Sequence, residues 1–128
     1  MEVESANTTG WSALKYRLRT TKADVLLAQE TLVKAKGLAE ASQWAYRHGW
    51  KSIWAIAGEG ASGKAAFGGV AIFARREIGL RLPIVGSRVV CDARGVMAVI
   101  EAPGHRSTIY VSVLSSRAGL VRTDLGHP

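Results

Sequence analysis

The sequence has few of the residues that crosslink a small domain or bind metals in it. It contains one cysteine, Cys91, and three histidines, His48, His105 and His127, which lie far apart along the chain. A single cysteine excludes an internal disulfide framework, and we expect no disulfide-linked partner. No Cys or His residues occur at metal-ligand spacing, which argues against a zinc module.

Long apolar stretches are also missing. No run approaches the roughly 18 residues that a membrane-spanning helix needs. The first residues, Met1-Glu2-Val3-Glu4, are acidic, whereas a secretory signal begins with basic residues and continues into an apolar run. These absences predict an intracellular protein, cytoplasmic or nuclear, without a membrane partner.

The sequence does contain enough apolar material for a folded core. Of its 128 residues, 48% are hydrophobic, which fits a single domain over residues 1–128 and argues against disorder. The 17 Lys and Arg residues outnumber the 10 Asp and Glu residues, giving a net charge of +7. This excess occurs in both halves of the chain, so it belongs to the folded body. Nucleic acid is therefore a reasonable anionic partner.

Strand and helix patterns alternate in the first half of the chain. Residues 1–6 alternate as in a half-exposed strand, and residues 25–28 form a continuous apolar run typical of a strand buried on both faces. Helical spacing begins at Trp11 and returns over residues 34–48, where Gly49 follows as a C-cap. The expected class is α/β, with a mixed sheet or sheets and flanking helices.

The second half shows only strand patterns. Apolar runs occupy residues 52–57, 69–74, 88–92, 96–101 and 108–114. Turn residues separate the later runs, which predicts a β-meander. Residues 115–128 have no clear period and are expected to form an irregular tail. The order of elements looks unfinished there, because no helix follows to cover the strand near residue 110.

The loop between two of these strands contains GEGASGKA at residues 58–65, which nearly matches a phosphate-binding loop. Such a loop needs Ser or Thr after its Lys to hold Mg²⁺, and a helix after it to receive the phosphates. Here Ala65 follows Lys64, and a strand pattern follows the loop. We therefore interpret it as a connection that does not bind nucleoside triphosphates.

A polar triplet, Gln29-Glu30-Thr31, directly follows the buried strand at residues 25–28. Ligand sites in α/β folds lie at the carboxyl ends of core strands, and Mg²⁺ prefers oxygen ligands such as carboxylates. The simpler alternative is a solvent-facing Glu at a strand end. Asn7 ends the first expected strand in the same way, although Asn before a turn most often serves only the turn.

The order of these features resembles the endonuclease/exonuclease/phosphatase superfamily, and in particular the nuclease domains encoded by retrotransposable elements. Its members open with a strand ending in Asn, continue through a helix to an Asp-apolar-Gln-Glu-Thr strand end, and later carry a Gly-Gly-Val-Ala-Ile strand. This chain has Ala6-Asn7, then ADVLLAQET at residues 23–31, then GGVAIFAR at residues 68–75. The similarity covers roughly residues 1 to 120.

The resemblance implies the N-terminal part of an incomplete superfamily sandwich, and it implies roles for individual residues. Glu30 would ligate a divalent metal, Mg²⁺ or Mn²⁺, and Asn7 would act as a catalytic residue by hydrogen bonding within the phosphate-hydrolysis site. Gln29 and Thr31 would shape the strand end. The metal would polarise a phosphoryl oxygen. The first two strands would then pair in parallel, so that Asn7 and Glu30 meet at one rim, close enough to share an ion or a water.

The chain also departs from the superfamily pattern. Members have a Tyr after the strand that corresponds to residues 110–113, where this chain has Leu114-Ser115-Ser116. The later Gly-Asp-Phe-Asn-like and Ser-Asp-His-like runs, which supply a catalytic Asp, Asn and His, do not occur, and neither His105 nor His127 matches the catalytic position. Without them, general acid–base catalysis and charge stabilisation are largely missing.

Three functional hypotheses follow. The first is a truncated or degenerate Mg²⁺-dependent phosphodiester hydrolase, endonuclease-like and inactive alone. In the second, another chain or a longer gene product supplies the remaining half. The third is a non-catalytic basic α/β module that binds nucleic acid, for which salt-dependent DNA binding without cleavage would be the sign.

Clustered basic residues and tryptophans allow two interpretations each. Arg75 and Arg76, together with Arg81 and Arg88, could bind a phosphate backbone of the substrate, or they could form a solvated rim, because no aromatics interleave them. The four tryptophans have apolar neighbours and are expected to anchor the core rather than stack on bases.

Overall fold

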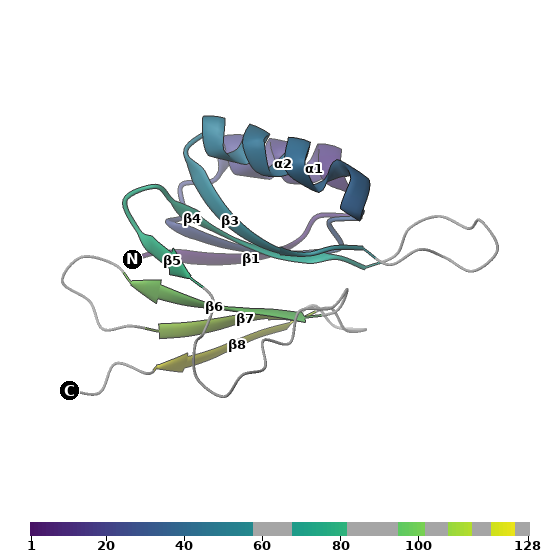
Figure 1. Ribbon diagram of the computed structural model, residues 1–128. Coiled ribbons are helices and arrows are strands. Elements are labelled where there is room, and N and C mark those ends of the chain that lie inside the picture. The colour runs from purple at the N-terminus through teal and green to yellow at the C-terminus, as the bar shows by residue number, and fades with distance from the viewer. Residues whose placement is uncertain (58–67, 82–94, 102–107, 114–118, 125–128) are drawn as a thin grey trace.

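The chain forms three layers: two helices, a mixed sheet of four strands, and an antiparallel sheet of four strands (Figure 1). This computed structural model describes residues 1–57, 68–81, 95–101, 108–113 and 119–124. In chain order the elements are β1 (Val3–Asn7), α1 (Trp11–Thr20), β2 (Val25–Gln29), α2 (Ala35–Arg47), β3 (Trp50–Ala55), β4 (Val70–Arg75), β5 (Gly79–Arg81), β6 (Gly95–Glu101), β7 (Thr108–Val113) and β8 (Gly119–Asp124). The α/β class predicted from the sequence is confirmed.

The mixed sheet has the strand order β1-β2-β4-β3. β1 and β2 run in parallel, whereas β4 is antiparallel to both β2 and β3. The parallel pair is joined through α1, since parallel neighbours need a crossover connection. β1 and β2 therefore end at the same edge of the sheet.

β2 is the centre of the molecule, because each of its five residues is buried. Val25 and Leu27 face the antiparallel sheet, in a cluster that also contains Ile72 and Ile100. Leu26 belongs to the cluster under the helices. Burial on both faces explains why the strand is continuously apolar, and it confirms the sequence-based prediction.

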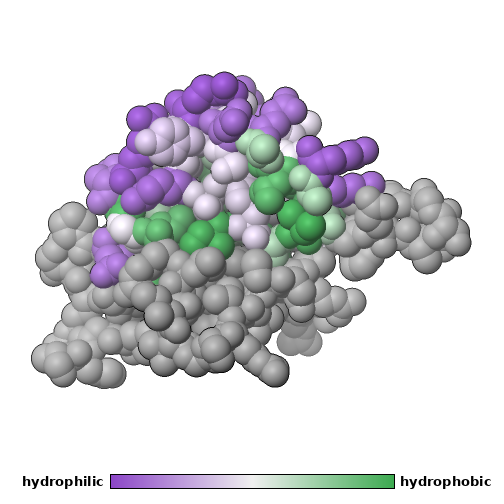
Figure 2. Space-filling view, viewed as in Figure 1, coloured by the Kyte–Doolittle hydropathy of each residue, from purple (hydrophilic) through white to green (hydrophobic). Residues whose placement is uncertain are grey.

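Both helices lie on one face of the mixed sheet. Leu14 and Leu18 of α1, and Ala41 and Ala45 of α2, are buried at helical spacing. Figure 2 shows hydrophilic residues over the outer side of the helical layer and apolar residues below them, toward the sheet. No helix in the described part of the chain is long and apolar enough to cross a membrane.

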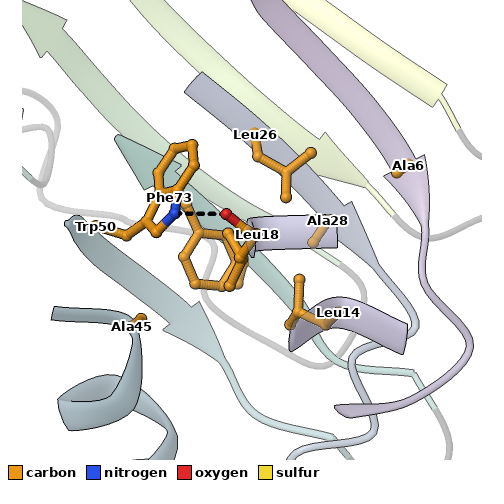
Figure 3. Close-up of a cluster of buried hydrophobic side chains, with 9 residues drawn as sticks. Ala6, Leu14, Leu18, Leu26, Ala28, Ala45, Trp50 and Phe73 are labelled. Atoms are coloured by element: carbon orange, nitrogen blue, oxygen red, sulfur yellow. Dashed lines mark hydrogen bonds between the residues drawn. The ribbon is translucent and has the colours of Figure 1, made fainter. Parts of the chain in front are cut away.

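Trp50 joins the helical layer to the sheet (Figure 3). Its side chain is fully buried, and its indole Nε1–H donates to the carbonyl of Leu18 at 3.1 Å. The guanidinium carbon of Arg75 lies 3.8 Å from the centre of the Trp50 ring. Trp50 is therefore a core anchor, as predicted. The other three tryptophans, Trp11, Trp44 and Trp54, are partly buried and pack against the same cluster.

The antiparallel sheet is a meander in the order β5-β6-β7-β8, as the turn pattern predicted. The expected run at residues 88–92 lies outside the described residues. The expectation of an irregular tail from residue 115 was wrong over Gly119–Asp124, because these residues pair with β7 as strand β8. Strand formation there follows from a neighbouring edge that offers backbone partners, which local periodicity does not reveal.

Replacing Trp50 tests the joint between helices and sheet. Trp50→Ala should lower the free energy of unfolding by about 3–5 kcal/mol, because it leaves a cavity and an unpaired Leu18 carbonyl. The control is Tyr16→Ala, since Tyr16 is 63% exposed and should change stability by about 0.5 kcal/mol at most. Urea unfolding followed by circular dichroism measures both. Similar losses in the two variants would contradict the role given to Trp50.

Candidate functional site

The carboxyl ends of β1 and β2 lie side by side. In the parallel register Asn7 is opposite Gln29, so Glu30 is the first residue beyond the pair. The predicted parallel pairing of these strands is thus confirmed. Open α/β sheets bind ligands at this kind of edge.

Hydrogen bonds join the two loops that leave this edge. The amide of Thr8 donates to the carbonyl of Gln29 at 2.8 Å, and the amide of Gly10 donates to that of Glu30 at 2.8 Å. The buried hydroxyl of Thr8 also donates to the Gln29 carbonyl, at 3.0 Å. Sequence reasoning missed Thr8. No local pattern could have selected it, because its hydroxyl bonds to carbonyls at the end of another strand, 21 and 22 residues away in the sequence.

The backbone at this edge is strained. Thr9, Glu30 and Leu32 have φ values of 52°, 53° and 56°. This left-handed region costs a residue with a side chain about 1–2 kcal/mol. Such conformations concentrate at functional sites, where the surrounding structure enforces them. Among the described residues, no other non-glycine residue has a positive φ.

Gln29 and Thr31 hold the strand end from inside. Both side chains are fully buried. The Gln29 amide donates to the hydroxyl of Ser5 on β1 at 3.2 Å and to the carbonyl of Leu27 at 3.2 Å. The Thr31 hydroxyl accepts from the amide of Val33 at 3.3 Å. With its two neighbours turned inward, Glu30 is left partly exposed.

The two motifs that carry the sequence resemblance are in direct contact. The amides of Thr31 and Leu32 donate to the carbonyls of Gly69 and Gly68, at 3.0 and 3.1 Å. Gly69 has a φ of 86°, and a Cβ there would lie 2.6 Å from the Thr31 hydroxyl oxygen. Gly69 is therefore required by its close approach to the loop after Glu30, and Gly68 has a positive φ of 70°. In the same loop, the Val33 carbonyl accepts a hydrogen bond from the amide of Ala57 at 2.7 Å.

The side chains of Asn7 and Glu30 have different surroundings. Asn7 is exposed, and its side-chain oxygen accepts from the Thr9 hydroxyl at 3.1 Å. It lines a hollow of about 350 Å³ together with Tyr16 and Arg17 of α1. Glu30 is not among the residues that line this hollow. The register brings the two residues to one edge, and their linkage by a shared ion or water stays a prediction.

The residues at this edge offer a divalent metal few ligands. Within the described ranges, no group of three or more His, Cys, Asp or Glu residues could hold a metal ion. Glu30 supplies one carboxylate and Asn7 one amide oxygen. Mg²⁺ is commonly held by one or two carboxylates, with water and substrate phosphates completing the shell. The edge therefore fits Mg²⁺ only together with a phosphate substrate, not as a site made wholly of protein ligands.

Arg75 and Arg76 lie at the other end of the sheet. β4 runs antiparallel to β2, so Val70 pairs with Gln29 near Glu30, whereas Ala74 pairs with Val25. The Arg75 side chain donates to the carbonyls of Ala23 and Thr21, at 3.1 and 2.9 Å. Arg75 thus has a structural role.

Arg76 lies next to it, exposed, with its guanidinium carbon 5.0 Å from the centre of the Tyr46 ring. The antiparallel direction of β4 places these two arginines at the opposite end of the sheet from Glu30. Their contact with a phosphate backbone stays a prediction. Arg88, the Arg81 side chain and the loop at residues 58–65 lie outside what the structure describes.

No protein-family model matches the chain, and a search of curated proteins finds no significant match.

A matched pair of glycine substitutions tests the contact between the two motifs. Gly49→Ala should cost about 1 kcal/mol, because Gly49 has a φ of 92° but open space around its Cβ position. Gly69→Ala should cost about 1–3 kcal/mol more, because the added methyl collides with Thr31. Thermal unfolding measures the difference, and equal losses in both variants would show that the close approach has no energetic effect.

Relief of the strain at Glu30 gives a second test. Glu30→Gly should stabilise the fold by up to about 1 kcal/mol, because glycine adopts a positive φ freely and this gain exceeds its added unfolded-state entropy. Glu30→Gln is the control, since it keeps the side chain and should leave stability within about 0.5 kcal/mol. Urea unfolding of both variants decides; a destabilised glycine variant would show that the conformation carries no strain.

Proposed function

We propose that this chain is a nuclease-like domain of the endonuclease/exonuclease/phosphatase type, a degenerate metal-dependent phosphodiester hydrolase that does not cleave by itself. One observation carries the proposal: the parallel register of β1 and β2, which brings Asn7 and the strained Glu30 to one edge of the sheet. The contact of the Gln-Glu-Thr strand end with the Gly-Gly strand supports it, since both belong to the resemblance.

In this proposal Glu30 binds a divalent cation through its carboxylate, and Asn7 orients a phosphate group by hydrogen bonding. The bound Mg²⁺ or Mn²⁺ would supply charge stabilisation at a phosphoryl oxygen. Gln29, Thr31 and Thr8 position the edge. The Gln29 side chain joins β2 to β1, and the hydroxyls of Thr8 and Thr31 hold the two loops. These three are positioning residues that do not touch the substrate.

The missing activity follows from the missing groups. Phosphodiester hydrolysis needs a base to position the attacking water and a donor to stabilise developing charge. The Asp, Asn and His runs that provide them in the superfamily do not occur in this sequence. Losing such groups typically costs several orders of magnitude in rate. A bound metal and one amide do not replace them.

A nuclease assay tests the proposal. Purified protein incubated with plasmid DNA and Mg²⁺ should give no cleavage above the level seen with EDTA. It should nevertheless bind Mn²⁺ weakly when DNA is present, detectable by proton relaxation, and Glu30→Gln should abolish that binding. Mg²⁺-dependent cleavage lost in Glu30→Gln would show that the remaining groups suffice for catalysis. Identical Mn²⁺ binding by both proteins would remove Glu30 from the site.

The alternative function is a basic module that binds nucleic acid without any metal. It is favoured by the net charge of +7, which is spread over the folded body. Salt-dependent DNA binding that is unchanged by EDTA and by Glu30→Gln would support this alternative over the proposed one.

A further inference from the structure

A hollow of about 430 Å³ lies between the first turns of the two helices. Three segments line it: α1 through Trp11 and Lys15, the loop at residues 32–34, and α2 through Lys36, Gly37, Glu40 and Ala41. Both helices begin where β1 and β2 end, so the hollow is near the edge described above but on the helical side of the sheet. Neither Asn7 nor Glu30 lines it.

Basic side chains dominate its charge. Lys15, Lys34 and Lys36 line the hollow, and Glu40 is the one acidic residue among its lining residues. Lys36 is exposed, whereas Lys15 and Lys34 are partly buried. Charges of one sign around a concave surface raise the local concentration of oppositely charged ligands. The hollow therefore favours an anion.

An aromatic ring adjoins these charges. Trp11 is held in place by edge-to-face contacts with Trp44 and Trp54, at centroid distances of 5.5 and 6.0 Å. The Lys15 amino group lies 5.6 Å from the centre of the Trp11 ring. Leu32, which is 37% exposed, adds apolar surface. An anionic group paired with Lys15 would thus bring an attached ring against Trp11 and Leu32.

The start of α2 adds to the positive potential. This helix of 13 residues has no acidic residue in its first turn and no side-chain cap at Lys34. Backbone amides and the helix dipole at such an end attract anions. Gly37 lines the hollow without a side chain, which leaves the first turn accessible.

From the hollow and its side chains together, we propose that this site binds a nucleotide, with the phosphate among the lysines and the base against Trp11 and Leu32. Its volume falls within the range of small-ligand sites. The nucleotide could be a free mononucleotide or the 5′-phosphorylated end of a nucleic-acid strand, which share this chemistry. The site is distinct from the proposed metal site, because neither Asn7 nor Glu30 lines the hollow.

Calorimetric titrations with defined probes test the proposal. The probes are adenosine 5′-monophosphate, adenosine, and a short single-stranded oligonucleotide with and without a 5′-phosphate. The monophosphate should bind saturably and roughly tenfold more tightly than adenosine, because a charged hydrogen bond contributes that much. If the phosphorylated oligonucleotide binds more tightly than the monophosphate, the ligand is a strand end. If the monophosphate binds more tightly, the ligand is a free nucleotide.

Charge variants decide whether the hollow is the site. Lys15→Gln and Lys36→Gln should each weaken binding roughly five- to tenfold. Glu40→Gln should strengthen it roughly twofold, an effect that misfolding cannot produce. Lys22→Gln is the control, because Lys22 is exposed in the connection between α1 and β2. Affinity that is equal in all four variants, or no saturable binding by either phosphorylated probe, would overturn the proposal. Neither result depends on nuclease activity, so this test fails or succeeds separately from that of the hydrolase.

Discussion

Burial of β2 on both faces is the constraint on which the rest of the structure depends. Its backbone pairs with β1 on one side and β4 on the other, while its side chains fill the cores under the helices and above the antiparallel sheet. A strand with no solvent-facing side has its register fixed, because a shift of one residue would draw the flanking Asp24 or Glu30 into the buried strand. The position of Glu30 is therefore set by the core, since it immediately follows that strand.

Much of this architecture could be predicted from the sequence, for reasons that are physical. The run at residues 25–28 and the helical spacing from Trp11 and from Lys34 are strong because each reflects burial of one face or two. β8 was missed because its strand conformation depends on pairing with β7 and not on a periodicity of its own. The sequence also left open at which end of the sheet Arg75 lies, because that depends on the antiparallel pairing of β4 with β2.

The features of the candidate site also divide into those that the sequence predicts and those that depend on tertiary packing. Asn7, Glu30 and the glycine pair could be selected from their motifs, and the parallel pairing followed from the helix between the strands. The left-handed conformations of Thr9, Glu30 and Leu32 could not be predicted, since none of these residue types prefers that conformation. Nor does a sequence pattern indicate that Lys15 and Lys36, on different helices, line one hollow. That proximity depends on how the helices pack on the sheet.

The anchoring of the loop after Glu30 has a consequence for how this domain can vary. Ala57 and Gly68 are the two described residues that flank residues 58–67. The Ala57 amide donates to the Val33 carbonyl, and the Gly68 carbonyl accepts from the Leu32 amide. Hydrogen bonds to the loop after Glu30 thus hold both flanking residues in place. Because the entropy of closing a loop grows only slowly with its length, inserts of different size could be exchanged at this position while Glu30 stays in place. An insert between Ala57 and Gly68 could therefore add a new binding surface beside the candidate site without changing the strands of the sheet.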